Sequence, residues 1–152
     1  QTLSLLYNMS SSYTYILYNH KIHKIIWIGT GSFVYCGYMH NHYIRLESDI
    51  LRPIVENEKK VLVMFGSKYC SWCKIIVEKH LNNLAIENKD SILVYIEAED
   101  KMGGWIYPKS MRLLPKEPDQ WPWWACFKDG KCIDTITTSA MWELNQWLDK
   151  LN

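Results

Sequence analysis

VLVMFGSKYCSWCK, residues 61–74, is the stretch of this 152-residue chain that decides its fold. Its first five residues, Val61 to Phe65, are continuously apolar, and such a run is typical of a central strand that is covered on both faces. A Gly-Ser pair ends the strand, and residues 70–87 then carry apolar side chains at helical spacing. The sequence therefore predicts a buried strand followed directly by a helix that opens with two cysteines.

The motif Cys70-Ser71-Trp72-Cys73 has the spacing and the position of a redox-active center. The first turn of a helix has unpaired N–H groups and a partial positive charge, and both stabilise a thiolate at the first cysteine. The two cysteines span about one helical turn, so their sulfur atoms can form a disulfide bond. We predict that the more exposed Cys70 attacks a substrate disulfide and that the more buried Cys73 releases the product. An inert cysteine pair and half of a metal site are the alternatives.

Outward from this motif, the pattern alternates helices and strands. Alternation of this kind implies a βαβ unit with parallel strands, and an Asp-Gly turn at residues 129–130 adds an antiparallel hairpin. The sequence thus predicts the α/β class. The predicted elements are a helix at 47–58 with Ser48 as N-cap, strands at 61–65 and 92–96, a helix at 70–87, strands at 123–127 and 132–137, and a helix at 139–151 with Ser139 as N-cap.

Two segments, residues 61–74 and WPWWACFKDGK at residues 121–131, resemble the thioredoxin-like family. The first is similar to the family's central strand and active-site helix start, and the second to its proline followed by a hairpin. The resemblance covers residues 47–152 and implies a thioredoxin-like fold, a central mixed sheet flanked by helices. It also implies a thiol–disulfide oxidoreductase that acts on protein dithiols and disulfides. No cofactor is expected beyond an electron partner, either another dithiol protein or glutathione.

Pro122 matches the family's cis-proline, which lies beside the cysteine pair. A cis bond turns the chain sharply and leaves the backbone groups of the preceding residue, Trp121, free to pair with an extended substrate. The resemblance therefore implies substrate binding by Trp121 and Pro122, with Trp72 beside them. The alternative is an ordinary trans loop. The full aromatic rim expected around the site is Tyr69, Trp72, Trp121, Trp123 and Trp124.

The sequence departs from the family pattern at two places in the motif region. Thioredoxins carry a buried Asp six residues before the first cysteine, and Met64 stands at that position. The pair between the cysteines is Ser-Trp rather than Gly-Pro, and this pair tunes the redox potential. The first departure favours an alternative function, a thioredoxin-fold binding or assembly module of a larger complex with weak or no redox activity.

The N-terminal third has no counterpart in a minimal thioredoxin. Residues 1–12 are predicted to be a poorly ordered lead-in, and short runs at 13–18, 22–28 and 33–39 predict a three-stranded meander. We therefore divide the chain into a β-rich extension, residues 1–46, for oligomerisation or docking, and a thioredoxin-like domain, residues 47–152. Some disulfide isomerases of the family dimerise through a β-rich N-terminal segment, which makes a homodimer through residues 13–45 a third hypothesis.

Composition excludes several other classes. With 17 basic and 16 acidic residues the net charge is +1, which argues against a nucleic-acid partner. No run reaches the roughly 18 apolar residues of a membrane-spanning helix. The start at Gln1 and the predicted chemistry favour an exported, periplasmic or lumenal location over a cytoplasmic one, whereas the unpaired Cys36 favours a reducing compartment.

The remaining cysteines and histidines offer weaker signals. Cys126 and Cys132 flank the predicted hairpin turn, so they either face each other across the strands or point to opposite faces. Two His pairs in the N-terminal region could in principle hold a metal, but solvated side chains are the expected state, and no metal site is predicted. These are His20, His23, His40 and His42.

Overall fold

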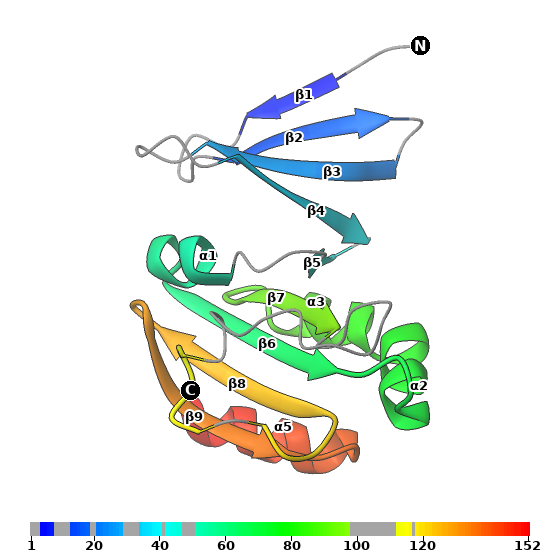
Figure 1. Ribbon diagram of the computed structural model, residues 1–152, viewed down its shortest axis with the longest axis vertical. Helices are drawn as coiled ribbons and strands as arrows, with labels where there is room; N and C mark the ends of the chain where they lie inside the picture. The colour runs from blue at the N-terminus through cyan, green and yellow to red at the C-terminus, as the bar shows by residue number, and fades with distance from the viewer. Residues whose placement is uncertain are drawn as a thin grey trace.

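The computed structural model describes most of the chain. For residues 4–7, 13–18, 21–28 and 34–40 it describes the backbone of four strands, and for residues 42–46, 51–97, 112–116 and 118–152 it describes side chains as well, apart from that of Pro53. The elements, labelled in Figure 1, are β1 Ser4–Tyr7, β2 Tyr13–Tyr18, β3 Lys21–Ile28, β4 Val34–His40, β5 Tyr43–Leu46, α1 Leu51–Asn57, β6 Lys60–Gly66, α2 Ser71–Lys79, α3 Leu81–Glu87, β7 Ile92–Glu97, β8 Trp123–Lys128, β9 Lys131–Thr137 and α5 Met141–Leu151.

One mixed sheet organises the chain, in the strand order β1-β2-β3-β4-β5-β7-β6-β8-β9. The strand β6 pairs in parallel with β7 and in antiparallel with β8, and all seven of its residues are buried. This confirms the central strand that the apolar run at residues 61–65 predicts. The five strands from β5 to β9 and the flanking helices form the predicted α/β architecture.

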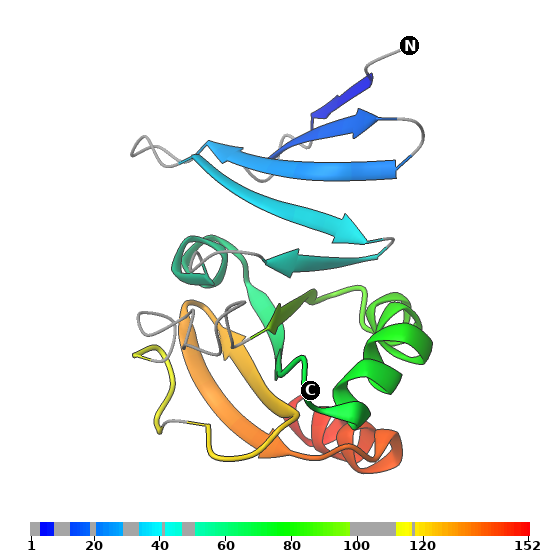
Figure 2. The same cartoon turned by 45° about the vertical axis from the view of Figure 1, so that its right-hand side comes forward.

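The sheet is covered on both faces, and alternate residues of β6 serve the two sides. Val61, Val63 and Phe65 pack in a cluster with residues of α1, whereas Leu62 and Met64 pack in a second cluster with residues of α2, α3 and α5. Figures 1 and 2 show the same arrangement of these helices around the central strand. The motif at the end of β6 therefore starts from a rigid support.

The N-terminal strands lengthen the same sheet. The predicted meander is present as β2, β3 and β4, and Figure 2 shows these strands continuing away from the helices. The prediction of a poorly ordered lead-in over residues 1–12 is wrong for residues 4–7, because these form β1 and pair with β2. The sequence analysis missed strand β5, which pairs in parallel with β7. One continuous sheet therefore contains strands from both sides of the predicted boundary at residue 46. The division there into two domains stays a prediction.

Two helix predictions need correction. The helix predicted at residues 70–87 is divided at His80 into α2 and α3. The His80 N–H nevertheless donates a hydrogen bond to the Ile76 carbonyl oxygen at 2.9 Å. The helix α5 has Ala140, not Ser139, as its N-cap residue. The predicted cap Ser48 lies outside the described residues. Among the described helices, none combines the length and the apolar character needed to cross a lipid bilayer.

The hairpin at the C-terminal end of β8 confirms the Asp-Gly prediction and settles the alternatives for the cysteines beside it. Asp129 and Gly130 both have positive φ, 49° and 82°, as the favoured two-residue hairpin turn requires. Cys126 belongs to the cluster under α2, α3 and α5, whereas Cys132 packs against the cluster on the α1 side. The two thiols therefore point to opposite faces, and both are free.

Candidate active site

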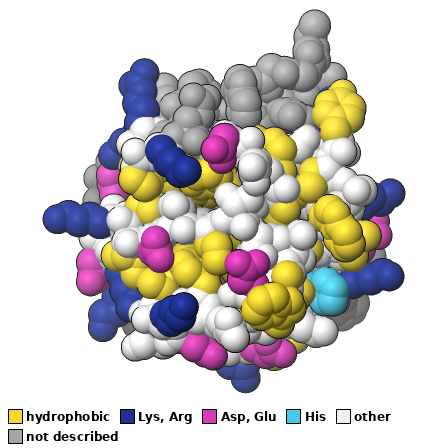
Figure 3. Space-filling view, turned by 90° about the horizontal axis from the view of Figure 1, so that it is seen from below, with side chains coloured by type: hydrophobic (Ala, Val, Ile, Leu, Met, Phe, Trp, Pro, Cys, Tyr) yellow, Lys and Arg dark blue, Asp and Glu magenta, His cyan; other side chains and the backbone are white. Residues whose placement is uncertain are grey.

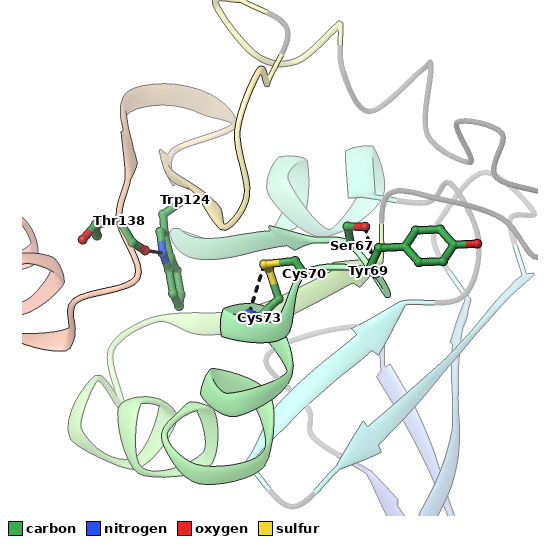
Figure 4. The surroundings of a disulfide bond; sticks show 6 residues. All are labelled: Ser67, Tyr69, Cys70, Cys73, Trp124 and Thr138. Carbon is green, nitrogen blue, oxygen red and sulfur yellow. Dashed lines mark hydrogen bonds between the residues drawn. A yellow bond between two sulfur atoms is a disulfide. The ribbon is translucent and has the colours of Figure 1, made fainter.

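The C-terminal end of β6 leads directly into the two cysteines at the start of α2 (Figure 4). The Ser67 hydroxyl oxygen accepts a hydrogen bond from the Tyr69 N–H at 3.2 Å, and the Ser67 carbonyl oxygen accepts one from the Cys70 N–H at 3.1 Å. This turn fixes Cys70 as the N-cap residue of α2. Its Sγ atom accepts a hydrogen bond from the Cys73 N–H at 3.1 Å. The Cys70 sulfur atom thus occupies the position of the usual capping oxygen. A thiolate at this position is stabilised by the helix N-terminus.

The two cysteines form a disulfide bond, with their Cα atoms 5.2 Å apart. Cys70 is partly exposed, whereas Cys73 is 0% exposed and packs in the hydrophobic cluster that contains Met64 and Trp124. The difference in exposure that the sequence analysis predicts is therefore present. One sulfur atom can be reached by another molecule, and the second is held behind it.

Aromatic side chains surround the motif, but fewer than expected are exposed. Trp72 is 59% exposed and Tyr69 is 75% exposed, although Figure 4 shows the Tyr69 ring pointing away from the disulfide bond. Trp123 and Trp124 are core residues instead, because β8 is covered on both faces. The Trp124 indole N–H donates to the Thr138 carbonyl oxygen at 3.0 Å. Across the face drawn in Figure 3, exposed hydrophobic side chains lie between scattered charged groups.

Trp121 and Pro122 lie at the same edge of the sheet as the cysteines. Phe65 pairs with Trp123 in antiparallel register, so the residues before Trp123 run beside the residues that follow Phe65. Trp121 is partly buried against both hydrophobic clusters, Pro122 is buried, and the peptide bond between them is cis. The structure thus brings together the two segments of the chain that resemble the thioredoxin-like family.

A polar pocket of about 620 Å³, which sequence reasoning missed, lies on the α2 side of the sheet. It opens between β5, β7 and α2. Its lining includes Tyr43, Arg45, Lys68, Lys74, Tyr95 and Glu97. Residues of β5 line one side of the pocket. A run of four residues is too short to predict a strand from the sequence. The alternation of polar Arg45 with buried Ile44 and Leu46 is the signal that could have found it.

Electrostatic contacts organise this pocket. The Arg45 guanidinium group pairs with the Glu97 carboxylate at 2.7 Å and lies 5.3 Å from the centre of the Tyr95 ring. Burial, followed by the Glu97 carboxylate, raises the pKa of Tyr95 to about 12, against an opposing effect of Arg45. Burial also raises the pKa of Tyr43. Both phenols are therefore neutral hydrogen-bonding groups at ordinary pH.

Of the histidines that were candidate metal ligands, His42 is the one with a described side chain, and it is exposed. The side chains of His20, His23 and His40 lie outside the described residues. Over the ranges with described side chains, no group of three or more His, Cys, Asp or Glu residues is placed to hold a metal ion.

The fold and the cysteine pair together define a thioredoxin-fold protein. Solved thioredoxins share the architecture: that of Schistosoma mansoni has 20% sequence identity and a TM-score of 0.59, over 74% of this chain and 97% of that one. Spinach chloroplast thioredoxin f has 18% identity and a TM-score of 0.59, over 72% and 93%. A thioredoxin f2 in complex with ferredoxin:thioredoxin reductase has 18% identity and a TM-score of 0.58, over 70% and 92%.

At these identities the comparison establishes the fold alone. No protein-family model matches the sequence, and no curated protein matches it significantly.

Proposed function

We propose that the protein is a thiol–disulfide oxidoreductase that acts on protein dithiols and disulfides through the Cys70/Cys73 couple. The observation that carries this proposal is the disulfide bond at the N-terminus of α2, with one cysteine accessible and the other buried. A helix N-terminus stabilises the thiolate of the accessible cysteine, which is the nucleophile in disulfide exchange. The fold shared with solved thioredoxins supports the same conclusion.

In the reducing direction, the Cys70 thiolate attacks one sulfur atom of a substrate disulfide. A mixed disulfide forms, and the other substrate sulfur leaves as a thiolate that takes up a proton from solvent. Cys73 then loses its proton and attacks the Cys70 sulfur atom, which forms the Cys70–Cys73 disulfide and releases the second substrate thiolate. Two electrons pass from the protein to the substrate. A second dithiol protein or glutathione then reduces the Cys70–Cys73 disulfide and restores the starting state. The same steps in reverse oxidise a substrate dithiol, and in that direction the disulfide form of the second protein or of glutathione restores the Cys70–Cys73 disulfide.

Polypeptide substrates fit the surroundings of the couple. We place Trp72, Trp121 and Pro122 in contact with the bound chain, since Trp72 is exposed beside Cys70 and the other two lie at the same sheet edge. A protein partner is also supported by the thioredoxin f2 of similar fold, which is solved in complex with a reductase. An exported or lumenal location stays a prediction.

A second candidate function is a binding or assembly module with weak or no redox activity. It is favoured by Met64, which is fully buried in the same cluster as Cys73 and offers no ionisable group, and by the N-terminal strands that extend the sheet. A homodimer through residues 13–45 belongs to the same group of proposals. Measurement of the protein's mass in solution tests the homodimer directly.

Reduction of a chromogenic disulfide by the reduced protein tests the proposed activity. We expect Cys70→Ser to lose at least about a hundredfold in rate, because no other described thiol is both accessible and at a helix N-terminus. Cys73→Ser is expected to accumulate a stable mixed disulfide at Cys70, visible by mass spectrometry. Cys132→Ser, the same chemical change outside the site, is the matched control and keeps the rate.

Two outcomes would count against the oxidoreductase assignment. Full activity in Cys70→Ser would show that another group carries the reaction. A wild-type rate no greater than that of free cysteine would favour the binding module instead.

A further inference from the structure

Because Gly66 has no side chain, atoms of Tyr95 and Cys73 lie close to the position that its Cβ atom would occupy. A Cβ atom added at Gly66 would lie 2.8 Å from the Tyr95 Cε2 atom and 3.0 Å from its hydroxyl oxygen, and 3.4 Å from the Cys73 Cβ atom. No side chain fits there without moving the Tyr95 ring. The glycine at the end of β6 therefore lets the phenol of β7 approach the buried cysteine of α2.

The proposed reaction demands a way to remove a proton from this cysteine. Cys73 is completely buried in an apolar cluster, so its proton has no direct path to solvent. Leu62 and Met64, the β6 residues in the same cluster, have no group that could take the proton or stabilise the thiolate. Tyr95 brings a polar group to the site and also lines the 620 Å³ pocket. Tyr95 thus borders both the position beside Gly66 that Cys73 also borders and a polar pocket that is open to solvent.

We propose that Tyr95 is a positioning residue for Cys73, whose phenol stabilises the thiolate and carries its proton to the polar pocket. The inference rests on the proposed oxidoreductase function and adds the proton route of the resolving step. As Cys73 attacks the mixed disulfide, its proton moves to the Tyr95 hydroxyl oxygen while the phenol proton moves to solvent in the pocket. The phenol ends neutral, the Cys70–Cys73 bond forms, and the substrate leaves as a thiolate.

Charged and titratable groups from neighbouring elements line the same pocket as Tyr95. They are Tyr43 and Arg45 on β5, Glu97 on β7, Lys68 before α2, and Lys74 and Glu78 on α2. The cation of Arg45, held over the ring, favours negative charge at this place, while the Glu97 carboxylate opposes it. Burial raises the pKa of Tyr95 to about 12, so the phenol keeps its proton and donates hydrogen bonds across the working pH range.

Stopped-flow reaction of the reduced protein with 5,5′-dithiobis(2-nitrobenzoate) from about pH 6 to 10 separates the two steps. The first release of the coloured thiolate reports attack by Cys70, and the second reports attack by Cys73. We expect Tyr95→Phe to leave the first rate unchanged and to slow the second about tenfold near neutral pH, since a hydrogen bond to a charged group is lost. The pH midpoint of the second step should rise by about one unit.

Tyr43→Phe is the matched control, because it removes the same hydroxyl group from the same pocket but not from the space in front of Gly66. It should leave both rates unchanged. Gly66→Ala is a second test that keeps the phenol and displaces its ring, and it should slow the second release as well. An unchanged first rate in each variant shows that the protein is folded.

The outcomes separate this inference from the function on which it rests. If the wild-type protein gives no first release faster than free cysteine, the oxidoreductase proposal fails. If both releases are fast and Tyr95→Phe has the wild-type pH profile in the second, the function stands and the role of Tyr95 is overturned. Equal slowing in Tyr43→Phe and Tyr95→Phe would also overturn it, because the effect would then belong to the pocket as a whole.

Discussion

Single residues determine which sulfur atom reacts. Cys70 occupies the N-cap of α2, and its sulfur atom accepts the Cys73 N–H that a capping oxygen would otherwise accept. Cys73 lies one turn further on, within the core. The motif predicts this asymmetry, because Cys70 stands at the exposed start of the helix whereas Cys73 points back toward the helix body.

The two free thiols with described side chains, Cys126 and Cys132, are expected to be unreactive. Burial raises the pKa of Cys132 to about 11, with a further contribution from Cys126, and burial also raises the pKa of Cys126. Both groups are therefore protonated thiols at pH 8. The sequence left their arrangement open, since the β-bulge after Cys126 that sets their register cannot be read from the hairpin alone.

Cys132 should make the protein less stable at alkaline pH. The pKa of its thiol is about 11 when folded and about 9 when unfolded, so between these values the unfolded chain loses a proton that the folded chain keeps. The free energy of unfolding should therefore fall as pH rises from about 9 to 11, by roughly 1–2 kcal/mol from this group. Urea titrations at several pH values should show a shallower decline in Cys132→Ala. An identical decline in both proteins would contradict the assignment.

At the scale of elements, the start of α5 depends on a residue outside the helix. The Thr138 hydroxyl oxygen accepts the Ala140 N–H at 3.1 Å, and the hydroxyl group donates to the Glu143 carboxylate at 2.6 Å. The sequence analysis placed the cap at Ser139 because serine is a favoured N-cap residue. Thr138 instead supplies these bonds just ahead of the helix.

Thr138→Val should therefore destabilise the protein by about 1 kcal/mol. Valine has nearly the same shape as threonine but can make neither bond at the start of α5, and loss of a cap typically costs about this much. Thr135→Val, the same change at a partly buried position of β9, is the control. Chemical denaturation of the three proteins measures the difference. Equal stability of Thr138→Val and the wild type would show that the bonds contribute nothing.

Element type is easier to predict than element limits. The strand β6 and its helix follow from a continuous apolar run and a motif, and the turn at Asp129 follows from local chemistry. The break at His80 could not be predicted, since apolar residues continue at helical spacing on both sides of it. The pocket and the approach of Tyr95 to Gly66 depend on strand neighbours that no local pattern defines.

At the scale of the whole molecule, the sheet joins the N-terminal strands to the thioredoxin fold. The strand β5 lies between β4 and β7, and three of its residues, Tyr43, Ile44 and Leu46, are buried. The added strands lengthen the sheet at one edge, as Figure 2 shows, whereas the cysteine pair follows the central strand β6. The described fold thus keeps β5 as part of the core, although the sequence pattern places it in the extension.

Truncation should reveal this difference. Removal of residues 1–46 should destabilise the protein by about 5 kcal/mol or more relative to removal of residues 1–41, because only the longer deletion removes the three buried side chains of β5. Urea unfolding of the two truncated chains, each compared with the full chain, measures this. If both truncated chains are equally stable, β5 is not part of the core.

Equilibration of the protein with glutathione buffers of graded potential tests the central claim most directly. Mass spectrometry after alkylation gives the fraction with the Cys70–Cys73 disulfide. The account predicts one reversible two-electron transition, at a potential within the roughly −270 to −120 mV of known thiol–disulfide proteins, and its complete loss in Cys73→Ser. A pair that stays in one state across all buffers, or a transition that persists in Cys73→Ser, would contradict it.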